Sequence, residues 1–254
     1  MSSILCLDNL SIQIGNRILF HNVSFNVSDG DVVLLSGTNG IGKSVLLKSI
    51  LRLEEEGKII KGKISTRTVD NVLALSDHKE LQQYRSRIAY VPQRDDYAQM
   101  GNVIVKDIIS DSNEAFSGRA LGVSEVNDLI DNWVPRRDDN SRVFDAKSRP
   151  AKFSGGEQRL LSLLSVIATR SQADLFIIDE PLNNLDFVNA KNISNLINKV
   201  IKMKPETAIL MVSHCRIFPF ITREIKLASD GIREISETYT CYSCLGVPNE
   251  EGFY

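Results

Sequence analysis

The sequence lacks long hydrophobic runs and has almost no net charge. No segment offers the roughly 20 uninterrupted apolar residues that a membrane-spanning helix needs. The N-terminus has neither the basic flank nor the apolar core of a signal peptide. We therefore expect a protein that stays in the cytosol. A net charge of −2 gives no indication of a nucleic-acid partner.

Cysteine is also scarce, because the chain has four cysteines in 254 residues. They do not form the disulfide framework of a small secreted protein. Cys241 and Cys244 have the spacing of half a zinc site, but the sequence holds no second pair of this kind. We expect them to be reduced thiols in a variable tail. Hydrophobic content of 43% and charged content of 24% are ordinary for a globular protein.

Apolar patterning indicates alternating strands and helices. Residues 4–28 alternate apolar and polar around a turn signal at Gly15-Asn16, and a smaller β segment follows at 57–69. Short buried strands are predicted at 32–35, 88–91, 175–178 and 208–212, a hairpin at 225–235, and helices at 44–53, 160–168 and 189–202. This alternation favours a parallel sheet covered by helices.

A long polar stretch interrupts this pattern. It carries short helical segments around 103–110 and 124–133, followed by a charged, turn-rich segment. We predict an inserted helical subdomain at 95–170. The core would then consist of 1–94 and 171–235, and 236–254 would be a variable tail.

A glycine loop lies between a predicted strand and a predicted helix. Its glycines let backbone N–H groups point at phosphate oxygens, and the helix adds its positive dipole end. Lys43 would supply a charge to the β- and γ-phosphates, and the Ser44 hydroxyl could ligate Mg²⁺. The phosphate-binding candidates are Gly37, Thr38, Asn39, Gly40, Ile41, Gly42, Lys43 and Ser44.

Two further motifs carry chemistry. Asp179 and Glu180 follow a buried strand, where Asp179 could hold Mg²⁺ and Glu180 could act on an attacking water as general base or positioner. The segment Ser154-Gly155-Gly156-Glu157 precedes an apolar helix. Two glycines and a serine at such a position make an N-terminus that accepts anions.

In this order and at these spacings, the motifs resemble the ATP-binding cassette of ABC transporters, from residue 4 to about 235. The resemblance implies an α/β P-loop NTPase of ABC type. Its core sheet would be mostly parallel, with an antiparallel β subdomain and a helical subdomain. It also implies hydrolysis of ATP with Mg²⁺ between two cassettes, where the Ser154–Glu157 loop of one chain closes on the γ-phosphate held by the other.

The resemblance implies roles for three more residues. Gln93 fits the Q-loop, which contacts Mg²⁺ and reports it to the membrane partner. Asp186 ends a segment that fits the D-loop, although Asn183 stands where serine is usual. His214 fits the H-loop, which contacts the γ-phosphate.

Phe153 and Glu157 stand where the family usually has leucine and glutamine. Two further departures concern nucleotide binding. Ile14 stands where an aromatic residue usually stacks on adenine, and Val45 stands where threonine or serine usually contacts the α-phosphate. Aliphatic packing at Ile14 and the lost hydroxyl at Val45 should weaken nucleotide binding without touching the hydrolytic groups. A strong preference for ATP would require another stacking residue, such as Phe20.

Three functions are compatible with these motifs. The first is an ATPase subunit that powers transport through separate membrane-spanning subunits. It would be peripheral at the inner face of the membrane and form a homodimer or a heterodimer with another cassette. The second is a soluble ABC ATPase that serves an assembly complex, as in iron–sulphur cluster biogenesis. The third, a non-hydrolysing interaction protein, is disfavoured by Glu180 and His214.

Overall fold

The computed structural model describes residues 3–53, 57–93, 97–137, 139–170, 172–182, 185, 187–213 and 218–235. These residues form two compact units. The first unit comprises the described residues of 1–88, 173–180 and 205–241, and the second comprises those of 89–172 and 181–204. The second unit thus extends beyond the insert predicted at 95–170, because it also contains the described residues of 89–94, 171–172 and 181–204.

The first unit contains an antiparallel sheet with the strand order β2-β1-β4. Its strands are β1 (Ser3–Ile14), β2 (Arg17–Ser28) and β4 (Lys58–Thr66). The first two form a hairpin in which Ile14 pairs with Arg17, and Gly15 takes a φ of 55° at the turn. Alternate residues of β2 are buried from Val23 to Val27, as expected for a sheet covered on one face. The predicted hairpin and the third strand are confirmed.

A second sheet forms the core of the first unit. Its strands in this unit have the order β6-β7-β3-β8-β9, and all neighbours are parallel except β8 and β9. Every residue of β6 and β7 is buried, which explains why these segments are apolar throughout. Both predicted strands and the final hairpin are confirmed. The bounds are β3 (Val32–Ser36), β6 (Leu175–Asp179), β7 (Ala208–Val212), β8 (Arg223–Ala228) and β9 (Gly231–Ile235).

Two helices of the first unit are α1 (Lys43–Ile50) and α2 (His78–Ser86). The first was predicted, whereas the second was not. Asp77 caps α2 by accepting hydrogen bonds from the N–H groups of its first turn. The Tyr84 hydroxyl donates to the Ile50 carbonyl at 2.6 Å and ties α2 to the end of α1. Tyr84 is the one buried residue of α2, so the sequence offered no apolar stripe from which to predict it.

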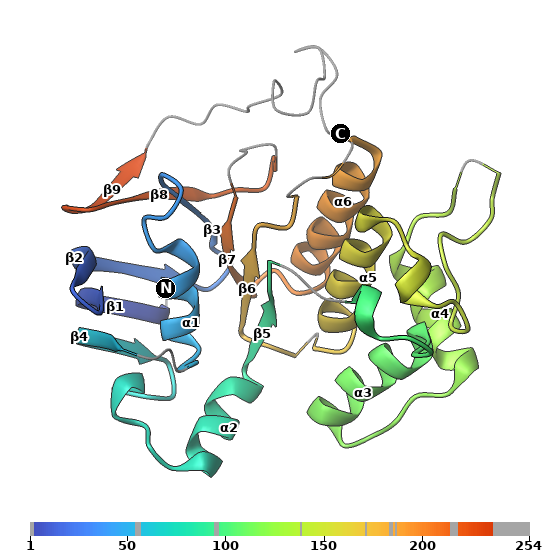
Figure 1. The fold of residues 1–254 in the computed structure, drawn as a ribbon, viewed down its shortest axis with the longest axis horizontal. Helices are drawn as coiled ribbons and strands as arrows, with labels where there is room; N and C mark the ends of the chain where they lie inside the picture. Colours follow the sequence, from blue (N-terminus) through green and yellow to red (C-terminus); the bar gives the residue numbers. More distant parts are fainter. Residues whose placement is uncertain are drawn as a thin grey trace. The chain divides into compact units, whose positions relative to one another are not determined.

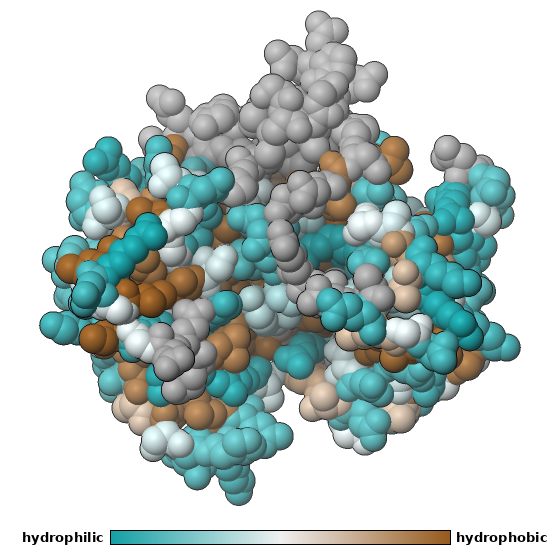
Figure 2. Space-filling view, in the orientation of Figure 1, coloured by the Kyte–Doolittle hydropathy of each residue, from teal (hydrophilic) through white to brown (hydrophobic). Residues whose placement is uncertain are grey.

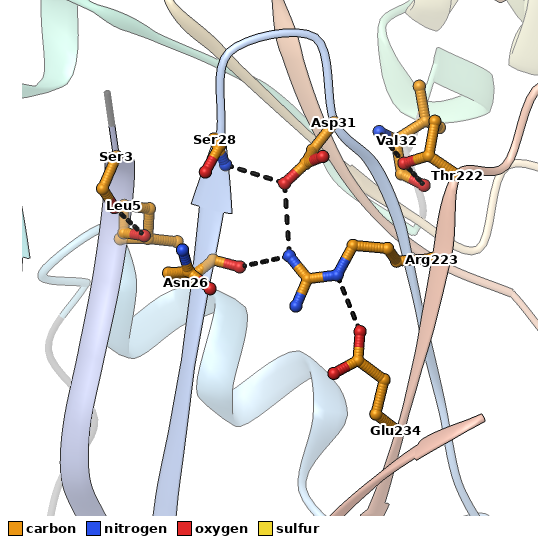
Figure 3. A network of polar contacts seen from close by, with 9 residues as sticks. All are labelled: Ser3, Leu5, Asn26, Ser28, Asp31, Val32, Thr222, Arg223 and Glu234. Atoms are coloured by element: carbon orange, nitrogen blue, oxygen red, sulfur yellow. Dashed lines mark hydrogen bonds and ion pairs between the residues drawn. The ribbon is translucent and has the colours of Figure 1, made fainter. Parts of the chain in front are cut away.

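Arg223 joins the two sheets of the first unit (Figure 3). Its guanidinium donates to the Asn26 carbonyl at 3.0 Å, and it pairs with Asp31 at 3.2 Å and Glu234 at 2.8 Å. Asp31 also accepts a hydrogen bond from the Ser28 N–H. Because the guanidinium holds its donors in a fixed fork, a single side chain links β2, the turn after it, β8 and β9.

The second unit is mainly helical (Figure 1). Strand β5 (Ile88–Val91) leads into it, and α5 packs against both α3 and α6. The helix predicted around 103–110 continues to Ser117. None of the helices in the described ranges is long and apolar enough to cross a membrane. The bounds are α3 (Val105–Ser117), α4 (Val123–Trp133), α5 (Gly155–Ile167) and α6 (Phe187–Met203), with 3-10 turns at Tyr97–Gln99 and Pro150–Lys152 and, in the first unit, at Val72–Ala74.

Candidate functional site

A glycine loop connects β3 to α1. Gly37 and Gly42 have φ values of 147° and 109°, which L-residues with a side chain rarely adopt. A Cβ on Gly37 would lie 2.7 Å from the Leu227 carbonyl oxygen, and one on Gly42 would lie 3.0 Å from Leu19. Both positions therefore require glycine. Among the described residues, no side chain caps the N-terminus of α1, so its first N–H groups can receive an anion.

Lys43 lies at the junction of this loop and α1. Its ammonium group donates to the carbonyl oxygens of Gly37 at 2.9 Å and Thr38 at 3.2 Å. Burial lowers the pKa of Lys43, and the negative charges of Glu180 and Asp179 oppose that shift. Lys43 is thus held inside the curve of the loop and within electrostatic reach of both acids.

The two acids lie at the same sheet edge as the glycine loop. Leu35 of β3 and Asp179 of β6 both pair with Val212 of the strand between them, β7. Because the three strands are parallel, the loop after β3 and the acids after β6 emerge side by side. Asp179 is buried at 2% exposure. The Glu180 N–H donates to the Val212 carbonyl at 2.9 Å, which fixes the backbone where this side chain begins.

Glu180 has a strained backbone. Its φ of 46° lies in the left-handed region, which costs a residue with a side chain about 1–3 kcal/mol. Such strain persists where the surrounding structure imposes it and is typical of functional positions. The strained residue is the one that the sequence suggests as the general base or positioner of the attacking water.

The serine–glycine motif begins α5 in the second unit. Ser154 is its N-cap: its hydroxyl accepts from the Glu157 N–H at 3.2 Å, and a Glu157 carboxylate oxygen accepts from the Ser154 N–H at 2.9 Å. This reciprocal capping box fixes the start of the helix. Ser154 and Gly155 are exposed, whereas Gly156 is buried. The exposed end of α5 is a second place where an anion can bind.

Comparison with known families now decides the class of protein. A family model described as "ABC transporter" matches residues 20–183, which include the glycine loop, the serine–glycine motif and both acids. The chain belongs to the ABC transporter family. The match confirms three predictions made from the motifs: the family, the ABC-type P-loop fold and the ATPase class.

Individual relatives agree with this assignment. The chain is 29% identical to a methionine import ATP-binding protein MetN 1 of Pectobacterium atrosepticum over 88% of its own length and 62% of the relative. It is 27% identical to a zinc import ATP-binding protein ZnuC of Rickettsia conorii, with 95% and 85% coverage. A phosphate import ATP-binding protein PstB of a Synechococcus strain is 30% identical, with 82% and 72% coverage.

Solved structures show the fold. The cassette superposes on a structure titled "Structure of ATP binding subunit of ABC transporter" with a TM-score of 0.70 at 21% identity, covering 92% of this chain and 90% of the other. The dimeric ABC transporter cassette MJ0796 gives a TM-score of 0.66 at 20% identity, covering 91% and 98%. At such identities the likeness supports the architecture alone.

The donor set of the cassette fits Mg²⁺ with a nucleotide. Ser44 is the second residue of α1, next to Lys43, and is half-buried. Its hydroxyl and the Asp179 carboxylate offer the hard oxygen ligands that Mg²⁺ prefers, and both belong to the first unit. Across the part of the chain that the structure describes, no group of three or more His, Cys, Asp or Glu side chains could hold a metal by itself.

The region expected to hold the base has three residues to consider. Ile14 is half-buried at the end of β1. Phe20, the alternative stacking residue, is completely buried beside Gly42, so it cannot stack on a base. Exposed Arg17, which pairs with Ile14, donates to the Gly40 carbonyl at 3.1 Å. Sequence reasoning missed Arg17, since no motif marks it. Val45 is half-buried in the first turn of α1.

Gln93 lies two residues beyond β5, in the second unit, and is half-buried. Arg159 of α5 was not predicted, although it is buried and holds the backbone near two site residues. Its guanidinium donates to the carbonyl of Pro92, which precedes Gln93, and to the carbonyl of Pro181, which follows Glu180, at 3.3 Å. The sequence shows an arginine at the start of an apolar helix, but nothing in it marks the two carbonyls that Arg159 contacts.

Several predicted residues lie outside the described ranges. These are His214, Asp186 with Asn183, and the two tail cysteines, Cys241 and Cys244. Their roles remain predictions.

The two glycines of the motif should respond differently to alanine. A Cβ on Gly156 would lie 2.3 Å from the Asn189 amide nitrogen of α6, whereas one on Gly155 would meet no described atom within 4 Å. Gly156→Ala must displace Asn189 and should cost about 1–3 kcal/mol, or several degrees in the unfolding midpoint. Gly155→Ala should leave the midpoint unchanged, and Asn189→Ala should restore much of the loss in Gly156→Ala. Thermal unfolding of the four chains checks this; equal losses at both glycines would contradict it.

Proposed function

We propose that this cassette binds ATP with Mg²⁺ at the glycine loop of its first unit, hydrolyses it, and powers transport through membrane-spanning subunits on separate chains. One observation carries the proposal. Lys43 donates hydrogen bonds to the carbonyls of Gly37 and Thr38 and interacts electrostatically with both acids, Asp179 and Glu180, at the same sheet edge. A cation, a cradle of N–H groups and two carboxylates are the parts that phosphoryl transfer requires.

Binding would use the loop backbone first. Backbone N–H groups of the loop between Gly37 and Ser44 would donate to phosphate oxygens, and Lys43 would place its charge between the β- and γ-phosphates. Ser44 and Asp179, both of the first unit, would hold the metal ion. Bound Mg²⁺ would neutralise charge that develops on the phosphoryl oxygens. The base would have only aliphatic packing at Ile14. Contacts to the phosphates would therefore supply most of the binding energy.

Hydrolysis requires an activated water in line with the γ-phosphate. Glu180 would accept the water proton or orient the water as its oxygen attacks phosphorus and ADP leaves. His214 would contact the γ-phosphate. The positive φ of Glu180 and its N–H bond to Val212 fix the direction in which this carboxylate starts.

A second cassette would complete the site. The exposed end of α5, with Ser154, Gly155, Gly156 and Glu157, would close on the γ-phosphate that the other chain holds, and Asp186 would lie at the same interface. Since each chain gives one half of two equivalent sites, the contact is self-complementary in a homodimer. A heterodimer with another cassette would use the same surfaces.

The partner class can be tested by co-purification. The names of the relatives support a transporter subunit located at the membrane through its partner. An affinity-tagged chain purified from its native cell after mild detergent extraction should carry an integral membrane protein, identified by mass spectrometry, in an amount comparable to its own. Recovery of a soluble scaffold instead, with no membrane protein, would favour the assembly-complex alternative. An unrelated soluble chain with the same tag is the control.

A further inference from the structure

Glu157 places a carboxylate at the N-terminal end of α5. One of its oxygens accepts from the Ser154 N–H at 2.9 Å, and the other accepts from the guanidinium of Arg137 at 2.8 Å. Arg137 lies 20 residues earlier in the chain, in the loop after α4. Both oxygens of the carboxylate are thus engaged, and its side chain is 22% exposed.

A carboxylate at this place creates an electrostatic conflict. The end of α5 attracts anions through its N–H groups and the helix dipole. A negative side chain in the first turn uses up this attraction and repels a second anion. The family usually has a neutral glutamine here, so the approach of a γ-phosphate does not meet this charge. In this chain a cation must compensate for Glu157.

Arg137 is held in position to do this. Its guanidinium also donates to the Val143 carbonyl at 3.0 Å, its N–H donates to Ser141, and its carbonyl accepts from Asn140 at 2.8 Å. The surface over α4 and the loop that follows it is mostly hydrophilic (Figure 2), although Phe144 of this loop is buried and stacks on Phe153. The guanidinium is therefore presented to Glu157 by a turn of its own.

We propose that Arg137 is a positioning residue of the Ser154–Glu157 loop: by neutralising and orienting Glu157, it lets the end of α5 accept the γ-phosphate of a nucleotide held by a second cassette. The proposal rests on the proposed function of the Ser154–Glu157 loop. It goes beyond that function by assigning a role to a residue outside every motif. The ion pair is half-exposed on the Arg137 side and contributes little to the stability of the chain. Its effect should appear when a second anion arrives.

Charge-removing variants test this assignment in the Glu180→Gln chain, which should bind ATP without turnover. They are Arg137→Gln, Glu157→Gln and the double variant. Glutamine at 157 can still accept from the Ser154 N–H, so the cap survives. Arg136→Gln is the matched control, because Arg136 anchors the same loop at the Asn140 carbonyl but pairs with Asp131 instead of Glu157. Light scattering with saturating ATP gives the dimer dissociation constant, and a fluorescent ATP analogue gives nucleotide binding to the monomer.

Arg137→Gln should raise the dimer dissociation constant about 25-fold, because each of the two equivalent sites contributes a factor of about five. Added salt should reduce this effect. The double variant should return to within about twofold of the parent chain. Arg136→Gln should behave as the parent, and monomer binding should not change in any variant.

Failure to rescue would mean that Arg137 acts only by anchoring its loop, and it would overturn the proposal. An unchanged dimer in Arg137→Gln, or an equal loss in Arg136→Gln, would do the same. If the parent chain with ATP bound forms neither a homodimer nor a heterodimer with another cassette, the proposed function itself is contradicted. The proposal for Arg137 then fails with it.

Discussion

Glu180→Gln should retain ATP binding and lose turnover by about a thousandfold, or about 4 kcal/mol of barrier. Glutamine has the same shape but cannot take a proton from water, and it orients water less strongly. Glu180 follows the buried Asp179 directly, at the sheet edge where Lys43 also lies. Phosphate release with Mg²⁺–ATP measures turnover, and titration with a fluorescent analogue measures binding.

A matched control separates this effect from a general loss of charge. Asp174→Asn makes the same isosteric change at the opposite end of β6, where Asp174 pairs with Arg87 at 2.7 Å on the surface. This chain should keep normal turnover, because a surface ion pair contributes about 0–1 kcal/mol. Near-normal turnover in Glu180→Gln would remove Glu180 from the hydrolytic role.

The backbone at Glu180 adds an independent argument for that role. The chain accepts a left-handed φ of 46° at a residue with a long charged side chain, although glycine or asparagine would fit that conformation at lower cost. The Glu180 N–H bond to Val212 and the following Pro181 hold the segment in this conformation. Such backbone strain is typical of functional positions, which supports a role for the Glu180 carboxylate.

Much of the fold could be predicted because burial has a local signature. Strands β6 and β7 are buried on both faces, so they appear as short uninterrupted apolar runs. Helix α1 follows a motif whose glycines mark its start. Helix α2 could not be predicted in the same way, since its single buried residue, Tyr84, gives no periodicity. Residues 181–204 were predicted in the core but belong to the second unit. Their place depends on contacts of α6 with α5, which no local sequence pattern predicts.

The same distinction holds for the candidate site: local motifs could be predicted, whereas long-range contacts could not. The glycine loop and the two acids are contiguous motifs, so their residue types and spacing suffice to find them. Residues that support them act across long separations: Arg17 reaches Gly40 over 23 residues, and Arg159 reaches Pro92 over 67. A charged side chain in a loop or helix has no mark of its partner until the fold brings the two together. Supporting residues therefore became visible only in the structure.

Ser154→Arg should block dimerisation driven by ATP while leaving nucleotide binding to the monomer intact. Ser154 is exposed at the end of α5, so a long side chain there would occupy the place proposed for the γ-phosphate of the second cassette. The first unit, with Lys43 and its loop, is not altered. In the Glu180→Gln background the parent chain should dimerise with ATP and dissociate with ADP, and light scattering follows both states.

Two controls separate bulk from the loss of the cap. Ser154→Ala removes the N-cap hydroxyl, at a cost of about 1 kcal/mol in stability, without adding bulk, so it should weaken the dimer far less than arginine. Ser124→Arg adds the same side chain to an exposed position of α4 in the same unit and should leave the dimer unchanged. A dimer that forms equally well with arginine at 154 would contradict the two-cassette site. A parent chain that stays monomeric with ATP but pairs with a different cassette would mean that the two halves of each site come from different proteins, and Ser154→Arg should then block that heterodimer at one of its two sites.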